Sequence, residues 1–457
     1  LAVIGAGPGG YVAAIRARQL GLGVAVIERD RPGGVCLNRG CIPTKSLIYQ
    51  AGRFRELARA EELGVTVDRS GFDYTRVHRK SRAAADALRK GVQFLFRKNR
   101  VELIEDEARL SGAHEISLKG GGKISADSII LATGSRPAGL PGLETDEKEV
   151  MTSDGALMMT ELPRRMAVVG AGPMGIEFAH IFHSFGVEVH LVEMMEHLLP
   201  LADHEVALFL SRLLKKAGLK ISVSTRAVSF QKTEKGLRLE LESAAGQRSV
   251  QECDRLLVCA GRTPNTEGLG LEQLGIATRN GFIETGDHYQ TTVPGVYAVG
   301  DVVEGTPFLA HAASKQGEIV AEHIAGQHPE PRLDPLLIPH AVYGEPEVAG
   351  FGYTEKQAQE QGLPFAKATF PYRGAGKSVA VEASEGLVKV LYDRDDSRIL
   401  GAHICGQAAT ELIHEVLVAG TCGLTVQDIA EVVHAHPTLS EAVMESMRAA
   451  EGRAIHV

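Results

Sequence analysis

The chain has 457 residues, of which 44% are hydrophobic and 23% are charged, and its formal net charge is −8. This is the composition of a globular protein, and its length indicates about three domains. It excludes intrinsic disorder and small disulfide-stabilised scaffolds. A negative charge without any long basic block makes nucleic acid a poor partner. No apolar run approaches the ~20 residues of a membrane span, so we expect none.

The cellular compartment follows only loosely from the sequence. Six cysteines without secretory features favour a reducing compartment. We expect a bacterial cytoplasm, or a mitochondrial matrix if the source is eukaryotic. The sequence begins without Met and runs directly into a glycine motif, so a preceding targeting segment stays open.

An internal repeat organises the first half of the chain. Residues 2–29 and 167–194 align without a gap, with eleven of 28 positions identical. Each copy reads as an apolar strand, G-A-G-P-x-G, a helix and a second strand that ends in a carboxylate. This is the dinucleotide-binding fingerprint, and two copies imply two bound dinucleotides.

Each residue type in this fingerprint has a physical reason. The first glycine makes a tight turn, the second lets the backbone approach a pyrophosphate at the helix N-terminus, and the third lets helix and strand pack closely. The carboxylate binds ribose hydroxyls. The residues in these four positions are Gly5, Gly7, Gly10 and Glu28 in the first copy and Gly170, Gly172, Gly175 and Glu193 in the second.

Further elements are predicted in chain order around the two copies. Apolar runs at 128–132, 255–260 and 296–299 predict short buried strands that each lead into a glycine motif. Helices are predicted near 200–216 and 408–420. From about 337 the glycine fingerprints stop, and strand-like runs such as 386–392 mix with helical ones. This pattern indicates a separate α+β domain.

Two cysteines lie in the segment G-G-V-C-L-N-R-G-C-I-P-T-K that follows the first copy. Cys36 and Cys41 could be structural, metal-binding or redox-active. Zinc would need two more ligands, and none lies nearby. A static disulfide would be unusual in a reducing compartment, so redox chemistry beside a dinucleotide site is favoured. The four other cysteines are expected to be ordinary buried thiols: Cys253, Cys259, Cys405 and Cys422.

The spacing of this pair constrains the local backbone. Residues five apart in an ideal helix have Cα atoms roughly 8–9 Å apart, whereas a disulfide needs about 4.4–6.8 Å. The segment must therefore bend or begin its helix irregularly if the bond forms. Gly40 relaxes the backbone, and Pro43 suits a first helical turn. A helix N-terminus there would favour a thiolate.

A histidine motif, H-A-H-P-T-L-S-E, lies near the C-terminal end. His436 precedes a proline, and Glu441 can return to orient the imidazole if a turn opens a short helix. A histidine paired with a carboxylate is a suitable base for a dithiol substrate, because the thiolate attacks a disulfide. The alternative is a polar turn whose histidines make only local hydrogen bonds.

Taken together, these motifs resemble the flavin disulfide reductases, and among them the dihydrolipoamide dehydrogenases. The match covers the whole length in the right order: first fingerprint, G-G-x-C-L-N-x-G-C-I-P-T-K, A-T-G-S, second fingerprint, G-R-x-P-N, G-D and H-x-H-P-T-x-x-E. The resemblance implies an α/β fold with two Rossmann-like domains and a C-terminal α+β dimerisation domain. The implied ranges are 1–145 for FAD, 146–267 for NAD, 268–336 for a segment that returns to the FAD domain, and 337–457 for the interface.

The same resemblance implies the roles of individual residues. The catalytic set would be Cys36, Cys41, His436, Glu441, Lys45 and Glu177, with Lys45 beside the flavin and paired with Glu177. FAD would be held by Gly5, Gly7, Gly10, Glu28, Lys45, Ala108, Thr133, Gly134, Ser135, Asp301, Leu309, Ala310 and His311. NAD would be held by Gly170, Gly172, Gly175, Glu193 and Gly261. No metal site is expected.

The implied activity is oxidation of protein-bound dihydrolipoamide by way of a Cys36–Cys41 disulfide and FAD to NAD⁺. The expected partners are a second copy of the chain, which would supply the histidine to each active site, and a lipoyl domain of a 2-oxoacid dehydrogenase or glycine cleavage complex. NAD is favoured over NADP because Met194 and Met195, not cations, follow Glu193.

Three alternatives stay open. The first is another NAD(P)H-dependent disulfide reductase of the glutathione or mercuric type. However, the chain lacks basic residues after the second fingerprint and a further cysteine pair near its end. A non-catalytic docking flavoprotein and a transhydrogenase are the others. Neither would need the cysteine pair.

Overall fold

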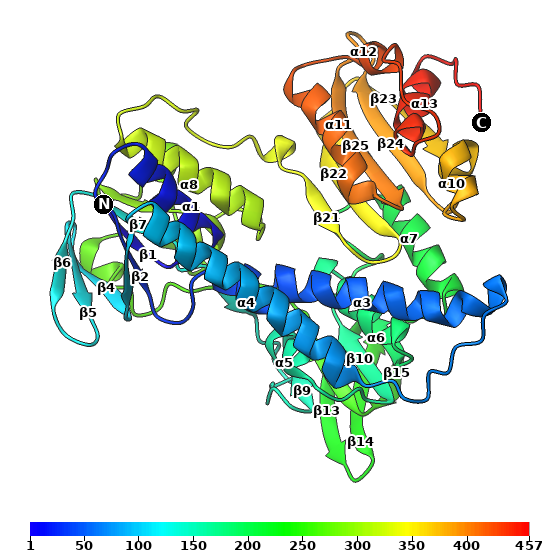
Figure 1. The fold of residues 1–457 in the computed structure, drawn as a ribbon, viewed down its shortest axis with the longest axis horizontal. Coiled ribbons are helices and arrows are strands. Elements are labelled where there is room, and N and C mark those ends of the chain that lie inside the picture. The colour runs from blue at the N-terminus through cyan, green and yellow to red at the C-terminus, as the bar shows by residue number, and fades with distance from the viewer. Residues whose placement is uncertain (457) are drawn as a thin grey trace.

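The computed structural model describes residues 1–456, which form three lobes (Figure 1). The first two lobes are built around parallel sheets, and the third is built around an antiparallel sheet. This is the predicted α/β architecture with a distinct C-terminal α+β domain. No helix in this range is long and apolar enough to cross a bilayer.

The first lobe is built from two separate parts of the chain, one before and one after the second lobe. Its parallel sheet has the order β20-β7-β1-β2-β3. Helix α1 packs against α8, which follows β20, so the chain returns to this lobe after building the second one. The strands and helices are β1 (Ala2–Ile4), α1 (Pro8–Gln19), β2 (Ala25–Glu28), α4 (Tyr74–Lys98), β3 (Glu102–Glu105), β7 (Ile129–Leu131), β20 (Val296–Ala298) and α8 (Ala310–Ile324).

The second lobe repeats this design, with a parallel sheet of order β12-β11-β10-β16-β9. Its elements are β9 (Val150–Met151), α5 (Ser153–Met158), β10 (Arg165–Val169), α6 (Pro173–Ser184), β11 (Glu188–Val192), α7 (His204–Lys216), β12 (Lys220–Ser222) and β16 (Arg255–Val258). The two sheets place the ends of β1 and β10, where the glycine fingerprints begin, in equivalent positions.

Two antiparallel meanders and two short ribbons complete these lobes. The sequence analysis did not anticipate the meanders, whose strands are half exposed and lack a glycine motif. They are β4 (Ala108–Gly112), β5 (Glu115–Leu118) and β6 (Lys123–Ser125) in the first lobe, and β13 (Thr225–Thr233), β14 (Gly236–Ser243) and β15 (Arg248–Cys253) in the second. One ribbon pairs β8 (Ser135–Pro137) with β17 (Arg262–Pro264), and the other pairs β18 (Thr278–Arg279) with β19 (Phe282–Ile283).

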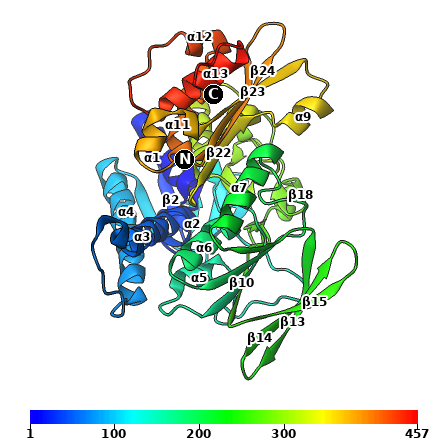
Figure 2. The ribbon, with the colours of Figure 1, turned by 90° about the vertical axis from the view of Figure 1, so that its right-hand side faces the viewer.

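The third lobe packs one sheet between helices and the second lobe, as Figure 2 shows from the side. Its sheet has the order β21-β22-β25-β24-β23. The elements are β21 (His340–Val342), β22 (Glu347–Gly352), α9 (Glu355–Glu360), β23 (Phe365–Pro371), α10 (Gly376–Ala380), β24 (Leu387–Asp393), β25 (Ile399–Gly406), α11 (Ala409–Thr421), α12 (Val426–Ala430) and α13 (Ser440–Ala450).

The expected strands and helices that frame the fingerprints are present. β7, β16 and β20 lie within the predicted runs, and α7 and α11 fall within a few residues of the predicted helices. Two of the four cysteines expected to be buried differ from that expectation. Cys259 is half-buried and lines the large cavity described below. Cys422 is exposed rather than buried, because it is the residue at which α11 ends.

Glycines set how closely each fingerprint helix approaches its strand. A Cβ on Gly10 would lie 1.9 Å from the carbonyl oxygen of Gly5, and a Cβ on Gly175 would lie 1.9 Å from that of Gly170. Neither contact is possible, so the third position admits no side chain. A Cβ on Gly172 would meet nothing within 4 Å, and its φ of −69° is ordinary.

These two positions make a matched pair for a stability test. Gly175→Ala should lower the free energy of unfolding by about 1–3 kcal/mol because backbone must move to admit the methyl group. Gly172→Ala meets no steric clash and should cost less, about 0.5–1 kcal/mol, because Ala is only a poorer N-cap than Gly. Thermal unfolding midpoints of both variants measure the difference. Equal midpoints would contradict the packing argument.

Candidate active site

A cavity of about 2100 Å³ extends between the two fingerprints. Pockets for one small ligand usually measure about 300–1,000 Å³, so this one has room for more than one large ligand. Most of the predicted site residues line it: Gly5, Gly7, Glu28, Cys36, Cys41, Lys45, Ala108, Thr133, Gly134, Ser135, Gly170, Gly172, Glu177, Glu193, Gly261, Asp301, Leu309, Ala310 and His311. Gly10 and Gly175 lie behind it and serve the packing described above.

The two fingerprint carboxylates have the same backbone contacts. Glu28 accepts hydrogen bonds from the amides of Ala6 at 2.7 Å and Asp30 at 2.8 Å. Glu193 accepts them from Ala171 at 2.6 Å and Met195 at 2.8 Å. Each carboxylate is thus fixed across the glycine turn at the edge of the cavity. Burial raises the pKa of Glu28.

The cysteine segment is broken into two helices at a glycine. Helix α2 (Gly34–Arg39) ends before Gly40, whose φ of −146° and ψ of −113° are not helical, and α3 (Cys41–Arg59) begins directly after it. The sequence had required such an irregularity for the two sulfurs to approach. Cys36 therefore lies in the first turn of one short helix, and Cys41 is the first residue of the next.

Cys36 and Cys41 are free thiols in this structure, and the thiol of Cys36 donates a hydrogen bond to the sulfur of Cys41. That bond, with a further contribution from the charge of Lys45, lowers the pKa of Cys41 to about 7 despite its burial. The same bond, together with burial, raises the pKa of Cys36. The arrangement therefore stabilises a thiolate on Cys41.

One carboxylate beside the pair receives contacts from two other segments. Glu177, on α6 and nearly fully buried, accepts hydrogen bonds from Lys45 Nζ at 2.8 and 3.0 Å. It also accepts one from the backbone amide of Tyr343 at 3.1 Å. Lys45 Nζ lies 4.4 Å from the centre of the Tyr343 ring, a cation–π contact. The sequence analysis missed Tyr343, which no motif marks.

A second polar cluster joins the A-T-G-S and G-D motifs. Ser135 Oγ donates a hydrogen bond to Asp301, and Arg262 Nε donates one to Ser135 Oγ at 2.6 Å. Burial raises the pKa of Asp301. Near this cluster, the side-chain amide of Asn265 donates a hydrogen bond to the Thr133 carbonyl oxygen at 3.0 Å. The motif G-R-x-P-N contains Arg262 and Asn265, but the sequence analysis assigned no role to either.

The C-terminal histidine lies outside the cavity. His436 Nδ1 is 2.9 Å from Glu441 Oε1, and the amide of Thr438 donates to the other carboxylate oxygen at 2.8 Å. Although desolvation opposes it, these hydrogen bonds hold the pKa of Glu441 below its usual value. The His436 side chain is 74% exposed, and neither residue lines the cavity of its own subunit.

The neighbouring histidine of that motif has a different environment. His434 is buried, with Nε2 2.6 Å from Glu415 Oε1 and Nδ1 2.9 Å from the Val432 carbonyl oxygen. Both ring nitrogens of His434 thus have partners within the third lobe, whereas His436 uses Nδ1 for its contact with Glu441. Among residues 1–456, no group of three or more His, Cys, Asp or Glu side chains could hold a metal ion.

The fold and cavity define a class of protein with two dinucleotide-binding lobes, a cysteine pair that lines the cavity between them, and a third lobe with an antiparallel sheet. Residues 1–317 match the family pyridine nucleotide-disulphide oxidoreductase, and residues 338–447 match the dimerisation domain of pyridine nucleotide-disulphide oxidoreductases. The chain belongs to this family, which implies FAD and NAD(P) as cofactors. The dimerisation domain indicates a homodimer.

Individual relatives are similar over essentially their full length. The chain is 39% identical to a dihydrolipoyl dehydrogenase of Bacillus subtilis, covering 99% of this chain and 98% of that one. It is 41% identical to one from Zymomonas mobilis (100% and 98%) and 40% identical to mitochondrial dihydrolipoyl dehydrogenase 1 of Arabidopsis thaliana (100% and 91%).

Solved structures show the same architecture. The crystal structure of LpdA from Mycobacterium tuberculosis matches with a TM-score of 0.90 at 27% identity, covering 98% of this chain and 99% of that one. The HOCl-induced flavoprotein disulfide reductase RclA from Escherichia coli matches with a TM-score of 0.87 at 26% identity, covering 98% of each chain.

The thiol pair gives a test of the site's electrostatics. In the reduced protein, Cys36→Ala should raise the pKa of Cys41 from about 7 toward the ordinary value of ~8.5, because the hydrogen bond to its thiolate is lost. The measurement is the pH dependence of Cys41 alkylation, located by peptide mass spectrometry. Cys253→Ala, at a buried thiol outside the cavity, is the control. An unchanged midpoint in Cys36→Ala would show that this hydrogen bond does not set the pKa.

Proposed function

We propose that the protein oxidises protein-bound dihydrolipoamide to lipoamide and delivers two electrons to NAD⁺ by way of FAD. The observation that carries the proposal is the Cys36–Cys41 pair at the break between two helices, facing the cavity shared by both fingerprints. Its support is the full-length similarity to dihydrolipoyl dehydrogenases.

We assign FAD to residues 1–145 together with 268–336, NAD to 146–267, and the subunit interface to the residues from 337 onward. The residues present fit two dinucleotides. Gly7 and Gly172 leave open space where a pyrophosphate would approach, since a Cβ on either would meet nothing closer than 3.9 Å. Both precede a helix whose N-terminal dipole favours an anion.

Each cofactor then has a set of residues from this chain. Glu28 would bind the FAD ribose, while Asp301, Thr133, Gly134, Ser135, Ala108, Leu309, Ala310 and His311 would line the rest of the FAD site. Glu193 would bind a ribose of the nicotinamide nucleotide, with Gly261 close by. Lys45, held by Glu177, would lie beside the flavin.

We propose NAD rather than NADP on charge grounds. Glu193 is buried at the fingerprint terminus, where it would repel a 2′-phosphate. Arg226 also lines the cavity, but its guanidinium is paired with Glu242 at 3.0 Å. The following residues, Met194 and Met195, carry no charge.

In the first half of the reaction, the oxidised enzyme carries a Cys36–Cys41 disulfide. His436 of the partner subunit, oriented by that subunit's Glu441, takes a proton from one thiol of dihydrolipoamide. The resulting thiolate forms a bond to Cys36 Sγ, and the Cys36–Cys41 bond breaks. Cys41 leaves as a thiolate, which its lowered pKa favours.

In the second half, the other substrate thiol attacks the mixed disulfide. The substrate–Cys36 bond breaks, lipoamide leaves with its own disulfide, and Cys36 takes up a proton. The enzyme has then gained two electrons and holds Cys36 as a thiol and Cys41 as a thiolate, with the first proton on His436 of the partner subunit. Bound FAD and NAD⁺ supply the route by which these electrons leave, so that the disulfide is restored and one NADH and one proton are released.

The lipoyl group that this site would serve is carried by a partner protein. We propose a lipoyl domain of a 2-oxoacid dehydrogenase complex or of the glycine cleavage system as that partner. The chemistry at Cys36 and Cys41 is the same for each, because each presents the same dithiol.

An anaerobic spectral titration tests the proposed function. Dihydrolipoamide should produce a broad long-wavelength thiolate–flavin band in the purified protein, and NAD⁺ should then remove it with formation of NADH. Cys36→Ser should abolish lipoamide turnover, and unchanged turnover in that variant would contradict the redox assignment. A yellow protein that does not react with dihydrolipoamide but is reduced by NAD(P)H would indicate another type of disulfide reductase with a different substrate.

Coexpression of two inactive variants tests whether the site is shared between subunits. A mixed dimer of Cys36→Ser and His436→Gln subunits has one site with both residues intact and one with neither. Since half of randomly formed dimers are mixed, the mixture should recover about a quarter of wild-type activity. Each variant alone is the control. If the mixture stays at the level of the controls, Cys36 and His436 act within one subunit.

A further inference from the structure

A buried lysine in the third lobe connects that lobe to the second. Lys389 lies in β24, where Val388 and Val390 face the core formed with α11 and α13, while Leu387 faces the core of the second lobe. Side chains alternate along a strand, so Lys389 shares the face of Leu387. The Lys389 side chain has no exposed surface.

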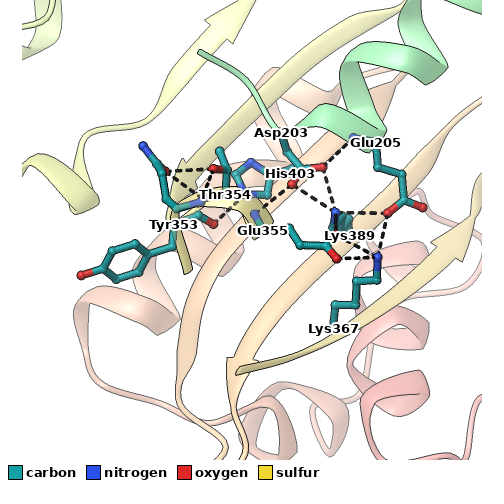
Figure 3. Close-up of polar contacts among 9 residues, drawn as sticks. Asp203, Glu205, Tyr353, Thr354, Glu355, Lys367, Lys389 and His403 are labelled. Atoms are coloured by element: carbon teal, nitrogen blue, oxygen red, sulfur yellow. Dashed lines mark hydrogen bonds and ion pairs between the residues drawn. The ribbon is translucent and has the colours of Figure 1, made fainter. Parts of the chain in front are cut away.

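Three carboxylates surround the ammonium group (Figure 3). Lys389 Nζ lies 2.9 and 3.1 Å from the two oxygens of Asp203, 2.7 Å from Glu355 Oε2 and 3.1 Å from Glu205 Oε2. Although burial alone would lower the pKa of Lys389, these hydrogen bonds hold it above its usual value. The lysine is therefore charged at neutral pH.

Within this cluster, Asp203 depends on Lys389 alone for a cation. Its side chain is also fully buried, whereas Glu205 and Glu355 are partly exposed and contact Lys367 as well. Burial lowers the pKa of His403 on the neighbouring strand, so that imidazole is neutral, and its Nε2 donates to the Tyr353 carbonyl oxygen. Loss of Lys389 would leave a buried carboxylate without a counter-charge.

Asp203 is placed where it fixes a wall of the nucleotide cavity. It is the N-cap of α7, accepting from the Glu205 amide at 3.1 Å, and it immediately follows the segment 194–202. Seven residues of that segment line the cavity: Met194, Met195, His197, Leu199, Pro200, Leu201 and Ala202. At the start of the segment, the Met195 amide donates a hydrogen bond to the Glu193 carboxylate. In its middle, the Leu199 amide donates one to the Ala171 carbonyl oxygen at 2.9 Å.

The far end of the segment is thus held from another lobe. We propose that Lys389 is a positioning residue for the pyridine nucleotide: by fixing Asp203 it holds the segment 194–202 in the place that NAD⁺ requires. The inference rests on the proposed function only in taking NAD⁺ as the ligand of the second lobe. It adds that an ionic contact between the third lobe and the second sets the affinity of the second lobe for its nucleotide.

Lys389→Met tests the inference in the FAD-loaded enzyme, because Met has a similar length and no charge. The dissociation constant for NAD⁺ should rise at least threefold, with unchanged FAD content and an unchanged KM for dihydrolipoamide. Lys367→Met is the matched control. It removes a lysine from the same cluster, but Lys367 contacts Glu205 and Glu355 and is 44% exposed, so NAD⁺ affinity should stay at the wild-type value.

Asp203→Asn provides a second test if Lys389→Met does not fold. Asn is an equally good N-cap, so α7 keeps its start while the contact with Lys389 loses its charge. The same threefold rise in the dissociation constant for NAD⁺ is expected.

Two results would overturn the inference. One is a rise of less than threefold in a folded variant. The other is an equal weakening of NAD⁺ and dihydrolipoamide with a lower melting temperature, which a purely structural role would give. If the wild-type enzyme binds no NAD⁺, the proposed function loses its basis as well. If the wild type binds NAD⁺ and Lys389→Met binds it with the same affinity, only this inference is overturned.

Discussion

The carboxylate of Glu177 is the point at which all three lobes meet. Glu177 comes from α6 of the second lobe, Lys45 reaches it from α3, and the backbone of Tyr343 reaches it from the end of β21 in the third. A nearly buried carboxylate requires such partners, because an unpaired one would carry a large desolvation cost. The contact therefore fixes Lys45, and with it the start of α3, relative to the second and third lobes.

Local features of the site were predictable because each motif contains its own physical reason. The fingerprint glycines are required by contacts within one strand–turn–helix unit, as the 1.9 Å approaches at Gly10 and Gly175 illustrate. The pairing of His436 with Glu441 spans five residues and needs only the short turn before α13. The fold class followed from the repeat, since two copies of one unit imply two similar sheets.

Contacts between lobes could not be predicted from the sequence, because the partners are far apart in the chain and no motif spacing links them. Tyr343 is 166 positions from Glu177, and Asp203 is 186 positions from Lys389. Lys389 reads as one polar residue in an apolar strand, which usually marks a solvent-facing side. Only the docking of the second lobe on that face makes it a buried cation. The half-exposed meanders were not predicted for a related reason. Their alternation of apolar and polar residues is weak, and such a sequence is hard to distinguish from a loop.

The start of α3 contributes to the difference between the two cysteines. Cys36 lies in the first turn of α2, a helix of only six residues, so its helix position does not disfavour an anion. Cys41 opens α3, where the dipole favours one, and Lys45 follows one turn later on the same helix. The hydrogen bond from Cys36 acts in the same direction. The start of α3, the charge of Lys45 and the hydrogen bond from Cys36 thus favour the thiolate on Cys41, and in the proposed reaction Cys36 is the thiol that exchanges with substrate.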